Sequence, residues 1–202
     1  LLDRRETDEE LDYAVPAVDD RVASFVTIMR GCNYSCTYCI VPYVRGREIY
    51  HSMDRILGEV QDRVREGARE ITLLGQTVNS YRHGDHRFAD LLRAVASADG
   101  VDRVRFISPH PYYMTDRVIE TMAEVPQICE GLHLPVQSGS NVMLKAMARN
   151  YTREQYVSRI EKMRQAMPDM SLSTDIIVGF PGETEKDFQQ TLSLIEELRF
   201  DR

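Results

Sequence analysis

Short apolar runs and longer amphipathic runs alternate along most of this sequence, and this alternation restricts the possible folds more than any other feature. The short runs have the apolar content of buried strands, and the longer ones repeat apolar side chains every three or four residues, as helices packed on one face do. The predicted strands cover residues 23–29, 71–74, 104–107, 132–136 and 172–178. The predicted helices cover residues 53–66 and 87–97 and begin near Thr115, Thr152 and Thr184.

Strands joined through helices run parallel, because the chain returns to the same end of the sheet before each new strand. Consecutive strand–helix units therefore predict an α/β fold, either an open doubly wound sheet or a barrel. The unusual residues follow the carboxyl ends of the predicted strands, where barrels hold their chemistry. These positions are a cysteine-rich loop, Gly75-Gln76, Ser108-Pro109-His110-Pro111, Gln137-Ser138-Gly139-Ser140 and Gly179-Phe180-Pro181-Gly182-Glu183.

Composition excludes several classes of protein. The chain of 202 residues is 43% hydrophobic and 28% charged, which is ordinary for a globular domain, and it lacks the run of about 20 apolar residues that crosses a bilayer. The net charge of −7 argues against a general polyanion binder. Much of the acid lies in residues 1–20, which we interpret as an acidic linker or arm before one domain at 21–202. Without a leader, we predict a cytoplasmic protein with no membrane contact, and we expect a monomer.

Three of the four cysteines lie close together, as Cys32, Cys36 and Cys39. So tight a group does not close loops as disulfide frameworks do, and it indicates metal binding in a reducing compartment. A structural zinc ion needs four ligands, and only three are local here. Three thiolates on a four-iron cluster leave one iron open to a small molecule. Zinc and unliganded core cysteines remain alternatives, while the isolated Cys129 is predicted not to be a ligand.

The spacing Cys-x-x-x-Cys-x-x-Cys after the first strand, with Tyr38 directly before the last cysteine, resembles the signature of radical S-adenosylmethionine (SAM) enzymes. The resemblance implies a partial (βα)6 barrel like that of triosephosphate isomerase, with about five of its strand–helix units in this chain. It also implies that the three cysteines hold a [4Fe–4S] cluster whose open iron binds SAM. In that family the reduced cluster cleaves SAM to give a 5′-deoxyadenosyl radical.

A narrower resemblance covers about residues 22–202. Its segments are similar to methylthiotransferases, above all to the tRNA enzymes that convert N6-isopentenyladenosine, beside the anticodon, to its 2-methylthio form. They are residues 29–46, 73–79, 108–111, 133–140 and 179–183. Two alternatives stay open within the family, namely another tRNA base or a ribosomal protein side chain as substrate. A third, from a different class, is a zinc-stabilised nucleic-acid-binding module without catalysis.

The resemblance is incomplete in two respects. Methylthiotransferases carry an amino-terminal domain with a second [4Fe–4S] cluster and a carboxy-terminal RNA-binding barrel, and neither is expected in this sequence, which also stops short of a sixth strand. The resemblance therefore implies a core domain that binds SAM but does not complete sulfur insertion alone. Its implied partners are tRNA and an electron donor such as flavodoxin or ferredoxin.

The resemblance also assigns cofactor contacts around the predicted rim. Gly75 and Gln76 occupy the place of a turn that accepts hydrogen bonds from the SAM ammonium, with Asn79 nearby. Arg149 resembles an arginine that pairs with the SAM carboxylate, for which a fork-shaped donor is suited. The other assigned contacts to the cofactor are Tyr38, Ser108, Gln137, Val178 and Phe180.

Asp175 falls inside the last predicted strand, where a buried carboxylate is costly unless it is paired. We expect it to face the SAM ribose or the substrate, or to pair with a structural arginine. Arg45 and Arg47 follow the cysteines and are candidate contacts to tRNA phosphate, with a solvated loop as the alternative. His110, between two prolines, is a further candidate substrate contact or simply part of a rigid turn.

Overall fold

A row of parallel strands organises the computed structural model, which describes residues 22–202; the predicted acidic arm at 1–20 lies outside the described residues. β1 (Ala23–Thr27), β4 (Glu70–Leu74) and β7 (Arg103–Phe106) form one sheet in that order. β8 (Gly131–His133) and β9 (Ser171–Ser173) form a second parallel pair. A parallel bridge between Val104 and Ile128 links β7 to the segment before β8. The predicted order of parallel strands is confirmed, although the ladder between them is interrupted.

Each predicted helix is present and begins close to its predicted start. They are α2 (Met53–Arg65), α3 (Phe88–Ala96), α4 (Asp116–Glu124), α6 (Arg153–Ala166) and α7 (Glu185–Leu198). Ser52, Thr115, Thr152 and Thr184 cap four of them, each hydroxyl accepting a bond from the backbone N–H three residues on. Thr152 and Gln155 form the reciprocal capping box that their spacing predicts.

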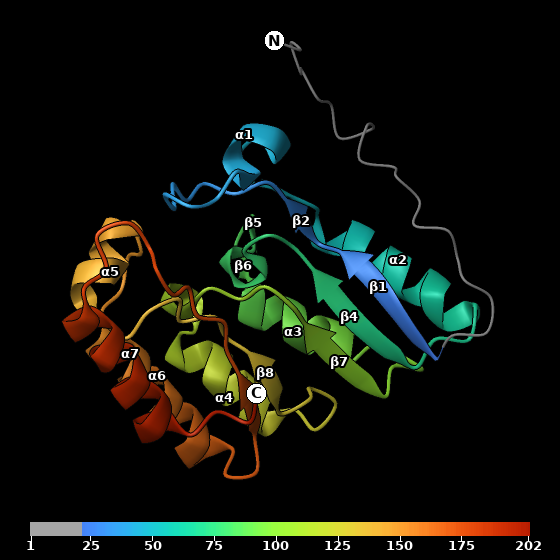
Figure 1. Ribbon diagram of the computed structural model, residues 1–202. Coiled ribbons are helices and arrows are strands. Elements are labelled where there is room, and N and C mark those ends of the chain that lie inside the picture. The colour runs from blue at the N-terminus through green and yellow to red at the C-terminus, as the bar shows by residue number, and fades with distance from the viewer. Residues whose placement is uncertain (1–21) are drawn as a thin grey trace.

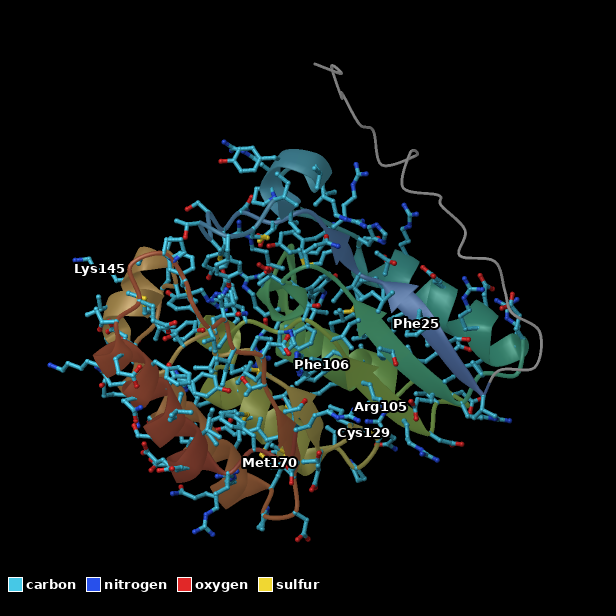
Figure 2. All side chains as sticks on the ribbon, viewed as in Figure 1. Phe25, Arg105, Phe106, Cys129, Lys145 and Met170 are labelled. Carbon is cyan, nitrogen blue, oxygen red and sulfur yellow. The ribbon has the colours of Figure 1, made fainter. Side chains whose placement is uncertain are left out.

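The two faces of the main sheet differ sharply. Val26, Leu73 and Phe106 are register partners in one row and are at most 6% exposed, so this row packs on the helices. Figure 1 shows α2 and α3 on one side of β1, β4 and β7. Successive side chains alternate between faces, so the next row holds Phe25, Thr72 and Arg105. Phe25 is 48% exposed and Arg105 is exposed, while Thr72 between them is buried. Figure 2 labels Phe25 on β1 and Arg105 on β7, with β4 between the two strands.

The four methionines at 143, 147, 163 and 167 belong to the buried interior, as their helical spacing predicts. Their exposed fractions are at most 3%.

Three predicted strand boundaries are wrong. The first predicted strand divides at Ile28 into β1 and β2 (Met29–Arg30), which pairs antiparallel with β3 (Ile49–Tyr50). The predicted strands 132–136 and 172–178 are regular only over β8 and β9. Beyond them the two segments keep isolated contacts, including a bond of 2.9 Å from Gln137 N to Asp175 O. The predicted strands were too long because the sequence stays apolar beyond the residues at which the hydrogen-bonded pairing of β8 and β9 ends.

Several short elements escape sequence analysis because none is long enough to show a period. They are α1 (Val41–Arg45), α5 (Asn141–Ala146), the 3-10 turns η2 (Val78–Ser80) and η3 (Pro111–Tyr113), and the hairpin strands β5 (Arg82–His83) and β6 (His86–Arg87). All of them lie in loops between the predicted strands and helices, so they shape the loops without altering the order of the main elements.

A buried polar network joins the loop after β8 to α7. Gly139 N donates to Thr191 Oγ1 at 2.9 Å, and a Cβ at Gly139 would lie 2.5 Å from Gln190 O, so only glycine allows this approach. Ser140 Oγ donates to Asp187 Oδ1 at 2.6 Å, and Thr184 Oγ1 donates to Asp187 Oδ2 at 2.6 Å. These bonds fix the loop that carries Gln137 against the last helix.

Asp187→Asn is expected to make the fold less stable near neutral pH and less sensitive to acid. Hydrogen bonds from Ser140 and then Thr184 hold the pKa of Asp187 below its usual value. A depressed pKa contributes stability above the unfolded-state pKa, and this contribution is lost as the pH falls through the folded-state value. Urea unfolding followed from about pH 7 to about pH 3 measures the difference. The variant's midpoint should be lower at the start and converge on that of the wild type in acid.

Asp85→Asn provides the control, because Asp85 is exposed on the β5–β6 turn. Parallel curves for Asp187→Asn and the wild type over the whole range would contradict the assignment.

Candidate metal centre

The three clustered cysteines lie on a loop that leaves β2 and returns to β3 (Figure 1). Cys32 N donates to Gly46 O at 3.1 Å near the start of this loop. Asn33 Nδ2 donates to Glu48 Oε2 at 2.9 Å, and Glu48 N donates back to Asn33 Oδ1 at 3.2 Å. Gly31 has φ +74°, and a Cβ there would lie 2.1 Å from Arg47 O. The two arms of the loop therefore meet too closely for any side chain at position 31.

All three cysteines are free thiols and face one cavity. The cavity has a volume of about 870 Å³, and its lining includes Cys32, Cys36, Cys39 and Tyr34. A turn with a bond of 3.0 Å from Cys39 N to Cys36 O brings the last two cysteines to the same side. Soft thiolates around an open space are the donor set that iron–sulfur clusters use, so the residues present fit such a group.

The same loop does not offer a site for a single metal ion. Among the residues that the structure describes, no three His, Cys, Asp or Glu side chains form a group that could hold one ion. A four-iron cluster makes a different demand, because each thiolate binds a different iron and the sulfurs do not converge on one point.

Two of the sulfurs have polar side chains against them. Thr77 Oγ1 lies 3.3 Å from Cys32 Sγ, which also accepts a bond of 3.4 Å from Tyr34 N. Arg149 Nη1 donates to Cys36 Sγ at 3.4 Å. Hydrogen bonds to a metal-binding sulfur adjust its charge and orientation, so these groups would act on any metal that the cysteines hold.

Arg149 reaches the cysteines from the segment after α5. Tyr151 supports it, accepting a bond of 3.2 Å from Nε, with the guanidinium carbon 5.2 Å from the ring centroid. Thr37 of the cysteine loop bonds the end of α5, with Oγ1 3.0 Å from Ala146 O. Segments more than 100 residues apart in sequence thus form one wall of the site.

The side-chain oxygen of Gln76 is a hydrogen-bond acceptor that lacks a donor among the described residues. Its Oε1 is buried and has no hydrogen-bond partner among the described residues, a state that costs free energy unless a ligand supplies a donor. Gly75 beside it packs tightly, because a Cβ there would lie 2.6 Å from Met29 Cγ. The predicted turn after β4 is therefore pressed against the residue that precedes the cysteine loop, with an acceptor available for a group such as an ammonium.

Three of the four described non-glycine residues with positive φ lie at the rim, the fourth being Arg199 at the end of α7. Ser108, Gln137 and Ala148 adopt φ values of +59°, +71° and +56°, which side chains other than glycine rarely occupy. The first two are predicted cofactor contacts, and the third precedes Arg149. Strained conformations of this kind concentrate at functional sites, where the surrounding structure imposes them.

Asn79 and His110 are buried and bind each other. Asn79 Nδ2 donates to His110 O at 3.0 Å, and His110 N donates to Asn79 Oδ1 at 2.8 Å. The His110 ring stacks on Tyr34 with centroids 4.3 Å apart, and its Nδ1 accepts from Tyr112 N. Burial, followed by the charge of Arg149, lowers the pKa of His110 to about 3, so the ring is neutral at physiological pH. Both residues brace the loops behind the cysteines.

Asp175 does not lie in a buried strand, because β9 ends two residues before it. Its side chain is 67% exposed, so the prediction of a buried carboxylate is wrong. The predicted pairing with an arginine is also wrong, since Asp175 Oδ2 lies 3.1 Å from His133 Nε2. His133 Nδ1 in turn lies 2.9 Å from Ser173 Oγ.

The remaining predicted contacts lie at accessible positions. Val178 is 63% exposed, and the turn after it closes through a bond of 2.5 Å from Gly179 N to Glu183 Oε2. Tyr38 is 38% exposed, Phe180 is partly buried, and Arg45 and Arg47 are exposed around the cysteine loop. Their roles toward a ligand stay predictions.

Sequence analysis missed Thr77, Tyr34 and Tyr151, which contact or brace the predicted ligands. Thr77 directly follows Gln76, but nothing local to it indicates a partner 45 residues away. Cys129 lies apart from the site, with its N–H 3.0 Å from Val104 O near the start of β7.

The sequence matches known proteins over most of its length. The sequence profile of the radical SAM superfamily matches residues 26–195. A protein of Trichlorobacter lovleyi named tRNA-2-methylthio-N(6)-dimethylallyladenosine synthase is 52% identical over 98% of this chain and 47% of its own length. A protein of the same name from Carboxydothermus hydrogenoformans is 57% identical over 89% of this chain and 42% of its own length. The chain thus spans less than half the length of these relatives.

Solved structures share the fold at low identity. The radical S-adenosylmethionine methyltransferase TsrM from Kitasatospora setae, with cobalamin and a [4Fe–4S] cluster bound, superimposes with a TM-score of 0.71 at 14% identity, over 88% of this chain and 35% of that one. Methylornithine synthase (PylB) gives a TM-score of 0.59 at 15% identity, over 89% of this chain and 51% of that one. Within residues 22–202, no helix has the length and apolar character needed to cross a membrane.

Proposed function

Since this chain belongs to the radical SAM superfamily, we propose that it is the core of a tRNA methylthiotransferase that adds a methylthio group to C2 of N6-isopentenyladenosine next to the anticodon. The names and identities of its relatives support this substrate. The observation that carries the proposal is the cavity onto which Cys32, Cys36 and Cys39 all open. Since tRNA is the proposed substrate, we place the protein in the cytoplasm.

In this proposal the three cysteines hold a [4Fe–4S] cluster, and the group supplies one-electron reductive cleavage of SAM when bound. The unpaired Gln76 Oε1 accepts a hydrogen bond from the SAM ammonium. Arg149 uses Nε and Nη1 on Tyr151 and Cys36, and its remaining N–H groups are available to the SAM carboxylate. Both residues thus orient the amino acid part of the cofactor.

The other rim residues would position the nucleoside part of SAM. We assign Ser108, Gln137 and Asp175 to its hydroxyl groups, and Val178 and Phe180 to its adenine. The exposed side chains of Val178 and Asp175 are consistent with a face that a ligand covers. Asn79 and the neutral His110 do not contact SAM in this proposal. They hold the loop after β7 and the cysteine loop in place.

The macromolecular partners belong to the same proposal. Arg45 and Arg47 are exposed around the cysteine loop, where they could bind tRNA phosphate. An electron donor such as flavodoxin or ferredoxin would serve the cluster, and a second [4Fe–4S] cluster held outside this chain would supply the sulfur.

The proposal is tested in two steps. Protein reconstituted anaerobically with iron and sulfide should bind about four irons per chain and release 5′-deoxyadenosine from SAM when dithionite is added. Deletion of the gene in its host should then remove 2-methylthio-N6-isopentenyladenosine from tRNA digests. Zinc in place of iron would contradict the first step. An intact tRNA nucleoside profile with a change in a ribosomal protein would favour the alternative substrate.

A further inference from the structure

Thr77 places a buried hydroxyl against one of the cluster-binding sulfurs. The residue is 3% exposed, and its Oγ1 lies 3.3 Å from Cys32 Sγ. In a free thiol either atom could donate the hydrogen bond. A cysteine that binds iron is a thiolate and has no proton, so in the loaded protein Thr77 must be the donor.

Hydrogen bonds on both sides of Thr77 fix the backbone from which this hydroxyl projects. Val78 N donates to Ser108 O at 3.3 Å, and Ser80 N donates to Thr77 O at 2.8 Å. Asn79 adds its two bonds to the backbone of His110. On the preceding side, the close contact between Gly75 and Met29 prevents the turn from shifting toward the strands. The backbone of Thr77 is therefore held in place by its neighbours, independently of Cys32.

We propose that Thr77 is a positioning residue that hydrogen-bonds the Cys32 thiolate and thereby raises the reduction potential of the cluster. A hydrogen bond to sulfur withdraws negative charge, and this favours the reduced cluster, which carries one more electron. The effect is strong in a buried site, where the surrounding dielectric is low. The inference rests on the proposed function, because it requires the three cysteines to hold the cluster.

The two cysteine sulfurs receive their side-chain hydrogen bonds from different residues, so the effect of the Thr77 hydroxyl on the reduction potential can be measured separately. Cys36 accepts from Arg149, whose guanidinium is also committed to Tyr151 and to the proposed cofactor. Removing Arg149 would therefore change several properties together. Thr77 contacts one sulfur and can be altered without disturbing the arginine, so the potential of the cluster reports on this single bond.

The test compares Thr77→Val and Thr77→Ser, since valine keeps the branched shape without the hydroxyl and serine keeps the hydroxyl. The potential of the reconstituted cluster is read by electron paramagnetic resonance during a titration with dithionite, which supplies the electron. Thr77→Val should shift the midpoint to a more negative potential, so a several-fold smaller fraction of cluster is reduced at a fixed potential. Thr77→Ser should titrate like the wild type.

Thr121→Val is the matched control. Thr121 is fully buried in α4, and its hydroxyl has no hydrogen-bond partner among the described residues, so the same substitution removes a hydroxyl without touching a sulfur. It should leave the midpoint unchanged. Thr77→Ala repeats the measurement should valine reduce iron loading.

The outcomes separate this inference from the proposed function. A wild-type protein that assembles no [4Fe–4S] cluster contradicts the proposed function itself. A wild-type cluster with the same midpoint as Thr77→Val, at equal iron content, overturns only the role of Thr77. Loss of iron in both the valine and alanine variants, with serine normal, would show that the hydroxyl retains the cluster rather than tunes it, and would also overturn the proposal.

Discussion

Alanine at Cys32, Cys36 or Cys39 should remove the cluster absorbance of the reconstituted protein and reduce 5′-deoxyadenosine formation by more than about 100-fold. Changes to groups that only support a metal ligand already cost about 10–100-fold in metal affinity or activity, and loss of a ligand costs more. All three thiols open onto the same cavity, and among the described residues that line it there is no further cysteine to replace a lost one. Iron content, the visible spectrum and product formation are measured on the same samples.

Cys129→Ala is the control for this series. The residue lies beside the start of β7, and burial raises the pKa of its thiol, which makes it a poorer thiolate ligand. It should keep wild-type iron and activity. Full iron loading in a Cys36→Ala protein, or loss of iron in Cys129→Ala, would show that the wrong cysteines have been assigned.

Gly31→Ala should destabilise the cysteine loop strongly and prevent cluster assembly. The new Cβ would lie 2.1 Å from Arg47 O in a backbone with φ +74°. A left-handed conformation costs an alanine about 1–2 kcal/mol, and forced overpacking typically adds about 1–3 kcal/mol. Urea unfolding of the protein without metal measures the loss of stability, and iron content after reconstitution measures the loss of the site.

Gly46→Ala separates the cost of the positive φ from the cost of the steric clash with Arg47 O. Gly46 has φ +72°, but a Cβ there would meet nothing within 4 Å. It should show only the conformational cost and still load iron. Equal effects of the two substitutions would mean that the approach to Arg47 is not what closes the loop.

The order of the strands and helices could be predicted from the sequence, because each main element is long enough to show the apolar repeat of a strand or a helix. Helix starts were also predictable, since a capping pair such as Thr152 and Gln155 lies within one turn of the sequence. The end of β9 was not, because Ile176 and Val178 are apolar although the ladder has already stopped at Ser173. This is why Asp175 was expected in a buried strand and lies exposed instead.

The candidate site was predictable where its residues are neighbours in sequence. The cysteine spacing and the turn at Gly75 and Gln76 fall in this class. The contacts of Cys32 with Thr77 and of Cys36 with Arg149 span 45 and 113 residues, and no local pattern encodes such distances. They arise from the packing of separate units, as does the burial of His110 beneath Tyr34.

The short antiparallel pair β2–β3 has a consequence for how an iron–sulfur cofactor enters a folded protein. Residues 31–48 depart from and rejoin the body at adjacent points. They are held by a two-residue ladder, by the bonds of Thr37 to the end of α5, and by side-chain contacts with Thr77, His110 and Arg149. None of these contacts belongs to a parallel ladder, so opening of this loop would break no parallel strand pair. Local opening of these 18 residues during metal insertion would therefore leave the parallel strands folded.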